Sequence, residues 1–325
     1  MPVNIYEQQA SNRRRTWAVM LVFVAFLFLF GYAFDRFYFD LQYPVTGAVA
    51  LLFGGGSAVS SYFRGDRAIL ASSGALPFDQ MEIERATPEE KFKLRQLENV
   101  VEEMRIASGL PRPRLYIVPD PDPNAFATGR DPERASIAVT RGLIDTVNRD
   151  ELQGVIAHEL SHVRNYDIRL MTVVAALVGA IALLSDWAGR GLSFGGGRRS
   201  SSGKDGGKGS GGIGIFVLVA WVASVILAPV VAQLLAMLVS RKREYLADAS
   251  AAEMTRNPLA LASALEKIEA AAGPTRSIKR GTANLCIADP LARPLGRREG
   301  RLASLFASHP PMEKRVAALR EMAYM

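Results

Sequence analysis

The chain has 325 residues, a net charge of +7 and a single cysteine, Cys286. One cysteine excludes both an internal disulfide and a cysteine-rich metal cluster. The basic residues lie beside long apolar runs and form no stripe interleaved with aromatic residues. The charge therefore indicates an anionic membrane surface as the partner, and no nucleic acid.

The first apolar run, residues 16–34, holds no charged residue and is about as long as a helix that crosses a bilayer. Arginines at 13–15 precede it and predict a cytoplasmic N-terminus. A cleaved signal peptide is the alternative. It is disfavoured because the run exceeds a usual signal core and no small-residue cleavage site follows. A second run, residues 44–63, is closed by two arginines, so residues 1–67 predict an N-terminal membrane hairpin.

Residues 68–167 have a globular composition and form the first part of a predicted soluble region. Thr87, which precedes an acidic stretch, predicts the start of a helix, and Gly109 predicts its end. Segments rich in β-branched residues, at 114–118 and 135–140, predict two short strands. This part of the chain therefore indicates a small sheet beside helices.

Two further apolar runs, residues 168–187 and 213–239, flank a Gly/Ser-rich segment at 189–212. We expect that segment to be a flexible loop rather than a phosphate-binding loop, because no strand precedes it and no Lys-Ser/Thr motif follows. If both runs cross the membrane, the basic residues of this segment lie on the outer side, against the positive-inside bias. Residues 168–240 therefore form either a spanning hairpin or one that does not fully span. Residues 241–325 are predicted to be a second, helix-rich globular part.

The segment HELSH, from His158 to His162, places two histidines four residues apart. On a helix these positions share a face one turn apart, so both imidazoles can reach one zinc ion. Glu159 lies on the adjacent face, where it can hold the metal-bound water and accept its proton. A chance match on an ordinary helix is the alternative. A helix is supported by an apolar stripe of Leu152, Val155, Ile156, Leu160 and Val163.

A catalytic zinc usually has three protein ligands and one position open for water. The sequence offers Glu244, just after the fourth apolar run, and Asp248 one helical turn further on. On a helix, Glu244 can coordinate the metal while Asp248 orients a ligand histidine. The alternative is a solvated acidic pair screened by Arg241 and Arg243. We expect the helix of His162 to continue directly into the third apolar run, which places the metal at the membrane interface.

Four segments, AHELSH, NAFATG, REYLADASA and SHPPMEKRVAALR, together resemble the HtpX-type membrane zinc metalloproteases, relatives of the CAAX prenyl proteases. The resemblance covers most of the chain. It implies one Zn²⁺ per chain, bound by His158, His162 and Glu244, with Glu159 as the general base. Asp248 matches the aspartate that follows the third ligand in that family.

The resemblance also assigns roles outside the metal ligands. His309 lies near the active site in that family, either as a hydrogen-bond donor to the developing oxyanion or as a structural residue. The stretch Asn124, Ala125, Phe126 and Ala127 matches an edge strand that lines the cleft. An exposed edge can pair with an extended peptide, whereas the alternative is a plain turn after two prolines.

The predicted fold is a mainly α integral membrane protein with about four membrane helices and a cytoplasmic α+β domain of the gluzincin type that carries a small sheet. By the resemblance, we expect a multi-pass inner-membrane endopeptidase that cleaves membrane or membrane-associated polypeptides at the cytoplasmic face in protein quality control. One alternative is a prenyl-protein processing protease, which usually has more membrane helices. The other is a catalytically silent scaffold tied by zinc, which has no use for Glu159. Arg315 is expected to be a helix position without a chemical role.

Overall fold

The computed structural model describes six stretches of the chain, residues 5–37, 40–78, 86–179, 241–271, 285–288 and 310–324. Several predictions lie outside the described residues: those for the end of the third apolar run, the Gly/Ser-rich segment, the fourth run and His309.

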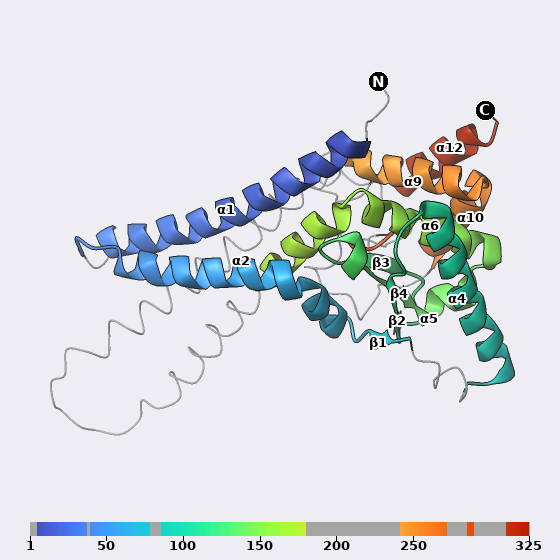
Figure 1. Ribbon diagram of the computed structural model, residues 1–325, viewed down its shortest axis with the longest axis horizontal. Coiled ribbons are helices and arrows are strands. Elements are labelled where there is room, and N and C mark those ends of the chain that lie inside the picture. The colour runs from blue at the N-terminus through green and yellow to red at the C-terminus, as the bar shows by residue number, and fades with distance from the viewer. Residues whose placement is uncertain are drawn as a thin grey trace.

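Two long helices, α1 (Ile5–Phe37) and α2 (Val45–Ser72), form a hairpin that projects from the rest of the molecule (Figure 1). Both are long and apolar enough to cross a membrane, with candidate spans at Gln9–Ala33 and Val45–Ser72. The two helices expected from the first two apolar runs are therefore present. Helix α2 continues past the predicted end, up to a turn at Gly74, whose φ of 64° favours glycine.

The hairpin packs one face against the body and presents another outward. Val19, Met20 and Phe23 of α1 lie against a helix formed by residues 167–179. Large apolar side chains elsewhere on the hairpin are exposed, namely Trp17, Leu21, Val22, Leu29, Val49, Leu52, Val59 and Phe63. A soluble protein rarely leaves so large an apolar patch uncovered, so this is the surface that lipid would cover.

A four-stranded mixed sheet has the order β1-β2-β4-β3. Its strands are β1 (Leu76–Pro77), β2 (Arg114–Val118), β3 (Ala125–Thr128) and β4 (Ser136–Thr140). Strands β2 and β4 are parallel, whereas β1 pairs with β2 and β3 pairs with β4 in the antiparallel sense. Both strands predicted from β-branched segments are confirmed. β3 is an edge strand, as the resemblance implied.

Helix α4 (Pro88–Ser108) begins and ends where the sequence predicts. The Thr87 hydroxyl accepts a hydrogen bond from the Glu90 amide, and the Glu90 carboxylate accepts one from the Thr87 amide. Gly109 ends the helix in the left-handed conformation, with a φ of 67°. Local capping chemistry is therefore enough to fix both ends of α4.

Helix α6 (Arg149–Arg164) is the centre of the body. It packs against α4, α9 (Arg241–Thr255) and α10 (Pro258–Ala270). The remaining helical elements are η1 (Pro132–Arg134), α5 (Arg141–Thr146) and α12 (Met312–Met322). Every residue of α6 from Gly154 to Val163 is buried, and Leu152 is buried as well, so the whole predicted apolar stripe is buried. The polar side chains in this stretch therefore lie away from water, where charge–charge interactions are strong.

The helix that carries His162 does not continue unbroken into the third apolar run, so that expectation is wrong. It ends at Arg164, and a turn at Asn165 and Tyr166 precedes the helix of residues 167–179. The Tyr166 amide bonds to the Val163 carbonyl at 3.2 Å, and Tyr166 takes a left-handed φ of 58°. The turn breaks the helix and places Asp167, the first residue of the next helix, beside His162.

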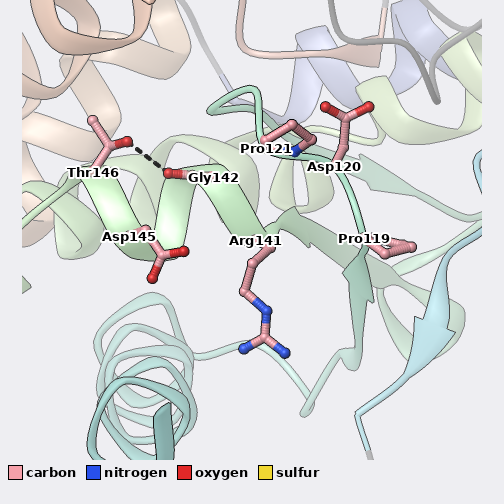
Figure 2. Close-up of a pocket in the computed structure, with 7 residues that line it drawn as sticks. All are labelled: Pro119, Asp120, Pro121, Arg141, Gly142, Asp145 and Thr146. Carbon is pink, nitrogen blue, oxygen red and sulfur yellow. Dashed lines mark hydrogen bonds between the residues drawn. The ribbon is translucent and has the colours of Figure 1, made fainter. Parts of the chain in front are cut away.

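A surface depression of about 410 Å³ lies at the start of α5 (Figure 2). Its lining residues are Pro119, Asp120, Pro121, Arg141, Gly142, Asp145 and Thr146. The Gly142 amide donates to the Asp120 carbonyl at 2.9 Å, and a Cβ at Gly142 would lie 1.9 Å from the Pro121 oxygen. Only glycine fits this close approach of α5 to the loop after β2. The depression includes none of the residues predicted to bind metal, substrate or water.

Candidate metal centre

Helix α6 turns His158 and His162 towards one point. Their imidazoles lie one helical turn apart, and the two Nε2 atoms are 3.2 Å from each other. Both side chains are buried, with exposed fractions of 1% and 4%. Two ring nitrogens at this separation either share a proton or bind a common cation.

Helix α9 packs against α6 and brings Glu244 into the same site. Its carboxylate oxygens lie 3.8 Å from the His158 Nε2 and 3.6 Å from the His162 Nε2. One ligand atom from each of the three residues lies within 4.8 Å of the others, so the three can hold one metal ion. The alternative of a solvated acidic pair is wrong, because Glu244 and Asp248 are only 1% and 2% exposed.

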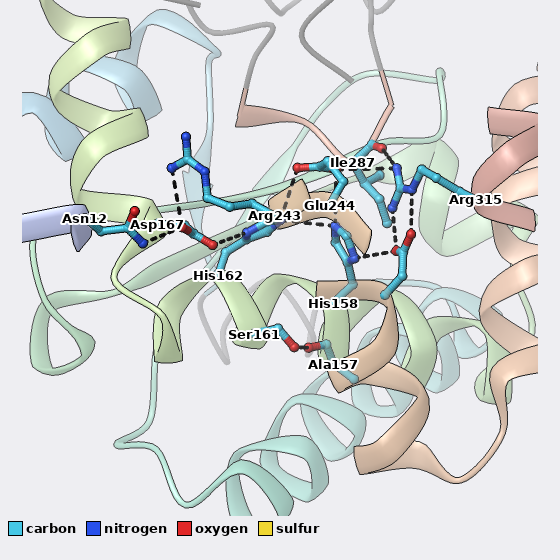
Figure 3. A network of polar contacts seen from close by, with 11 residues as sticks. Asn12, Ala157, His158, Ser161, His162, Asp167, Arg243, Glu244, Ile287 and Arg315 are labelled. Carbon is cyan, nitrogen blue, oxygen red and sulfur yellow. Dashed lines mark hydrogen bonds and ion pairs between the residues drawn. The ribbon is translucent and has the colours of Figure 1, made fainter. Parts of the chain in front are cut away.

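The outer nitrogen of each imidazole has a carboxylate partner. Asp248 Oδ1 lies 2.9 Å from the His158 Nδ1, and Asp167 Oδ2 lies 3.1 Å from the His162 Nδ1 (Figure 3). A carboxylate in this place keeps a proton on Nδ1 and leaves the Nε2 lone pair for a metal. Asp248 is where the sequence analysis expected it, whereas Asp167 was not predicted.

Arg315 of α12 lies at the site, where the sequence predicted only an ordinary helix position. Its guanidinium donates two hydrogen bonds to Asp248, at 2.8 and 2.7 Å, and its Nη1 lies 3.6 Å from Glu244. Burial acts to lower the Arg315 pKa, but the Asp248 charge outweighs it and raises that pKa. A buried guanidinium needs carboxylate partners, and those of Arg315 come from α9, far away in the sequence.

The buried charges of the site do not balance. Among the buried residues that the structure describes at the site, there are two guanidinium groups, of Arg243 and Arg315, and four carboxylates, those of Asp167, Asp248, Glu159 and Glu244. A divalent cation between the ligand atoms would balance the excess of negative charge. Two imidazoles and one carboxylate are also the donor set of many catalytic zinc sites. The residues present therefore fit a zinc ion.

The pKa values of the histidines reflect the same imbalance. Burial acts to lower the pKa of His162, but the hydrogen bond to Asp167 and the charge of Glu244 outweigh it and raise that pKa to about 9. Burial lowers the pKa of His158, against the hydrogen bond to Asp248. In the protein without metal, a proton on His162 supplies part of the positive charge that the carboxylates require.

Glu159 is 1% exposed, and neither of its carboxylate oxygens makes a hydrogen bond of normal geometry within the described part of the chain. Burial raises its pKa to about 7, with His162 acting against the rise and Glu244 adding to it. The backbone amide of Ala127 in β3 is near enough to lower that pKa in part. A buried carboxylate with no strong partner is costly, and such groups are typical of functional sites.

The sequence predicts an exposed outer edge for β3, but in the structure that edge is not open. It is paired in part with residues 285–288. The Ile287 amide donates to the Ala125 carbonyl at 3.0 Å, and Phe126 forms an antiparallel bridge with Cys286. All residues of β3 are buried as a result. The expected edge strand is present, but a segment distant in sequence covers part of it.

Asn124 and Ala127 lie on either side of that contact along the chain. The Asn124 Nδ2 donates to the Ala288 carbonyl at 3.2 Å, and its Oδ1 accepts from the Ala125 amide at 3.0 Å. Ala127, at the other end, is the residue whose amide influences Glu159. The four residues expected to bind substrate therefore link the covering segment to the acidic residue of the site.

Four residues of this network were not predicted to take part in it: Asp167, Arg243, Arg315 and Asn12, whose Nδ2 donates to Asp167 Oδ1 at 2.7 Å. An aspartate shortly after the second histidine is a usable signal for Asp167, since ligand histidines commonly have carboxylate partners. An arginine in the last motif segment is a weaker signal for Arg315. Asn12 carries no signal of its own, because it stands among polar residues before an apolar run. The remaining predicted residue, His309, lies outside the part that the structure describes.

Two histidines and a glutamate from two facing helices, with a buried glutamate directly after the first histidine, define a metallopeptidase type of centre. Comparison with known families agrees with this class: residues 92–323 match Peptidase family M48. The chain belongs to this family.

Named relatives make the assignment more specific. A Protease HtpX homolog from Caldanaerobacter subterraneus subsp. tengcongensis is 42% identical over 320 residues, which cover 98% of each chain. A second, from Streptococcus gordonii, is 40% identical over 319 residues, covering 98% of this chain and all of the relative. The chain is therefore an HtpX-like M48 metallopeptidase, which confirms the resemblance. A crystal structure of S. mikatae Ste24p matches with a TM-score of 0.46 and 20% identity, over 94% of this chain and 66% of that one.

Proposed function

We propose that this chain is a membrane-bound zinc endopeptidase that cleaves membrane or membrane-associated polypeptides at the cytoplasmic face of the inner membrane, in protein quality control. The observation that carries the proposal is the convergence of His158, His162 and Glu244 on one point beside the buried Glu159. A silent zinc scaffold is less consistent with this arrangement, because a structural zinc site is closed by four ligands and needs no base.

The ligands proposed for one zinc ion per chain are the Nε2 atoms of His158 and His162 and a carboxylate oxygen of Glu244. Asp248 and Asp167 hold the protons on the two Nδ1 atoms and so fix the imidazole planes. When bound, zinc supplies Lewis acidity towards water and the scissile carbonyl.

Glu159 is the proposed general base. One of its carboxylate oxygens accepts a proton from the attacking water and later passes it to the leaving amine nitrogen. A pKa raised by burial to about 7 suits a group that must both accept and release a proton near neutral pH. His309 is included as a donor to the developing oxyanion on the resemblance alone.

The site lies at the end of α1 that carries the arginines. Gln9 of α1 donates to the Arg164 carbonyl at 2.8 Å, and the Arg13 guanidinium lies 4.6 Å from the centre of the Tyr166 ring. Arginines before a first membrane helix favour the cytoplasmic side, which supports a cytoplasmic site.

The proposed organisation has four parts: a membrane hairpin at 1–67, a first protease part at 68–167, a second membrane hairpin at 168–240 and a second protease part at 241–325. Since His162 of the first protease part and Glu244 of the second lie together, the segment between them must return the chain to the same side.

For substrates, we propose antiparallel backbone pairing with β3, in place of residues 285–288. The covering segment supplies the support, because one of its amides is already bound to the β3 backbone and one of its carbonyls to the side chain just before β3. The Ala125 carbonyl accepts from Ile287, and Asn124 donates to the Ala288 carbonyl. Substrate and segment would then compete for one edge.

Replacement of Ile287 by proline tests this competition. Proline removes the amide that donates to Ala125, so the segment is held less tightly and a peptide substrate binds more readily. We expect KM for an unfolded polypeptide to fall about 5-fold, as the loss of one hydrogen bond suggests, with little change in kcat. Ile287→Val keeps the amide and is the matched control. A higher KM for the proline variant, at unchanged metal content, would mean that the segment helps to bind substrate and does not compete with it.

The main experiment uses the full chain in membrane vesicles and a soluble unfolded polypeptide added from outside. In inverted vesicles, where the cytoplasmic face is outward, we expect cleavage that stops on treatment with a chelator and returns when Zn²⁺ is restored. In vesicles of native orientation the same polypeptide should stay intact. Cleavage only in the native orientation would reverse the proposed side. Cleavage that survives full removal of metal would reject zinc catalysis.

A further inference from the structure

The start of the first membrane helix contacts the metal centre through Asn12. Its Nδ2 donates to Asp167 Oδ1 at 2.7 Å (Figure 3). It also donates to the Asn165 carbonyl at 2.9 Å. The side chain is fully buried. Asn12 lies within the candidate span Gln9–Ala33, at its first turn.

Asp167 links Asn12 to a proposed zinc ligand. One carboxylate oxygen accepts from Asn12, and the other lies 3.1 Å from the His162 Nδ1. Arg243 approaches the first oxygen as well, at 3.4 Å, which is a longer and weaker contact. Within the described part of the chain, the Asn12 amide is therefore the closer of the two contacts to that oxygen, and it restricts rotation of the carboxylate that faces His162.

The orientation of the Asn12 amide follows from its partners. Both nearby groups are oxygen acceptors, so the NH₂ end must face them. The Oδ1 of Asn12 makes no hydrogen bond within the described residues. An unpaired buried amide oxygen costs stability. The favourable polar interactions of the Asn12 side chain are therefore the two hydrogen bonds that its NH₂ group donates.

The contact that begins at Asn12 continues along the length of α1. Thr16 is fully buried one turn after Asn12, and its hydroxyl donates to the Asn12 carbonyl at 2.9 Å. Further along, Val19 and Phe23 pack against the helix of residues 167–179. Asp167 is the first residue of that helix. Helix α1 and the helix that begins with Asp167 therefore share one continuous contact, with its polar end at the metal centre.

We propose that Asn12 is a positioning residue for His162, acting through Asp167, so that the first membrane helix helps to set the metal affinity of the site. The inference rests on the proposed function, since it requires that His158, His162 and Glu244 bind a metal. The simpler alternative is that Asn12 only anchors α1 to the turn at Asn165. Gln9 provides such an anchor, because it bonds to the Arg164 carbonyl in the same region without touching Asp167.

The test compares Asn12→Ala with Gln9→Ala in the full chain. Zn²⁺ affinity is measured by competition with a chromophoric chelator, and the Co²⁺-loaded proteins are compared by their visible absorption bands, which report ligand geometry. We expect Asn12→Ala to weaken Zn²⁺ binding about 5-fold, less than the 10- to 100-fold typical of a direct partner of a ligand, and to shift the cobalt bands. Gln9→Ala should leave both unchanged.

A double-mutant cycle tests the path through Asp167. In an Asp167→Asn background, Asn12→Ala should have little further effect on Zn²⁺ affinity, because the link to His162 is already altered. Thermal unfolding of the metal-free variants shows whether each is folded. Equal Zn²⁺ affinities for Asn12→Ala, Gln9→Ala and the unaltered protein would overturn this inference alone. Equal losses of Zn²⁺ affinity in Asn12→Ala and Gln9→Ala would also overturn it. So would fully additive effects of Asn12→Ala and Asp167→Asn on Zn²⁺ affinity. An unaltered protein that binds no Zn²⁺ would overturn the proposed function and this inference together.

Discussion

Glu159→Gln is expected to abolish cleavage and to leave the metal in place. Glutamine has nearly the same shape but cannot accept a proton, and Glu159 is not among the three residues whose ligand atoms converge. Loss of a general base costs about 10²- to 10⁴-fold in rate, so little activity should remain. Elemental analysis and a cleavage assay on the same sample measure both properties.

Ser161→Ala is the matched control for this variant. Ser161 lies in the same HELSH segment and is fully buried, but its hydroxyl donates only to the Ala157 carbonyl of its own helix, at 2.8 Å. Activity and metal content should both be kept. Cleavage at the normal rate by Glu159→Gln would reject the proposed mechanism.

The inactive variant also addresses the quality-control proposal. Membrane fractions of cells that make the unaltered protein or Glu159→Gln are compared by proteomics. Substrates should accumulate with the inactive form, and we expect them to be membrane or membrane-associated polypeptides. Accumulation confined to soluble proteins would remove the membrane part of the proposal.

The elements that the sequence predicted correctly depend on neighbours a few residues apart. The ends of α4 follow from Thr87, its partner Glu90 and Gly109. The shared face of His158 and His162 follows from the period of the helix. Such patterns involve contacts within one element, which is why they are visible without a structure.

The features that were missed or mistaken depend on contacts between distant segments. Asn12 and Asp167 are 155 residues apart, and Arg315 is 67 residues from Asp248. The cover on β3 is equally remote, since Asn124 and Ala288 are 164 residues apart. Tertiary packing determines which group pairs with a buried charge or a strand edge. Neither the composition nor the periodicity of the sequence therefore reveals that partner.

The turn after α6 was missed for a different reason. Asn165 and Tyr166 are not strong helix breakers, and the apolar run that follows suggests an uninterrupted helix. The turn is supported by contacts from outside: the Asn165 carbonyl accepts from Asn12, and the Arg13 guanidinium lies over the Tyr166 ring. Tertiary contacts here outweigh local helix preference, and the result is the placement of Asp167 at the metal centre.

Glu244→Ala is expected to lose the metal, with a reduction in Zn²⁺ affinity of at least about 100-fold, the upper end of what loss of an outer partner causes. Glu253→Ala, an exposed glutamate on the same helix α9, is the matched control and should bind Zn²⁺ normally. Elemental analysis of both variants measures the difference. Full retention of zinc by Glu244→Ala would show that another residue is the third ligand.

Unfolding does not explain the loss expected for Glu244→Ala, and the charge balance of the site shows why. In the metal-free protein, removal of Glu244 relieves its repulsion of Glu159 but also takes a negative charge away from Arg315 and from protonated His162, so the two effects oppose each other. The two hydrogen bonds between Arg315 and Asp248 remain and continue to hold α12 against α9. The metal-free variant should therefore stay folded and unfold at a temperature near that of the metal-free unaltered protein. Only the unaltered protein should then gain stability when Zn²⁺ is added, because a ligand stabilises only the state that binds it.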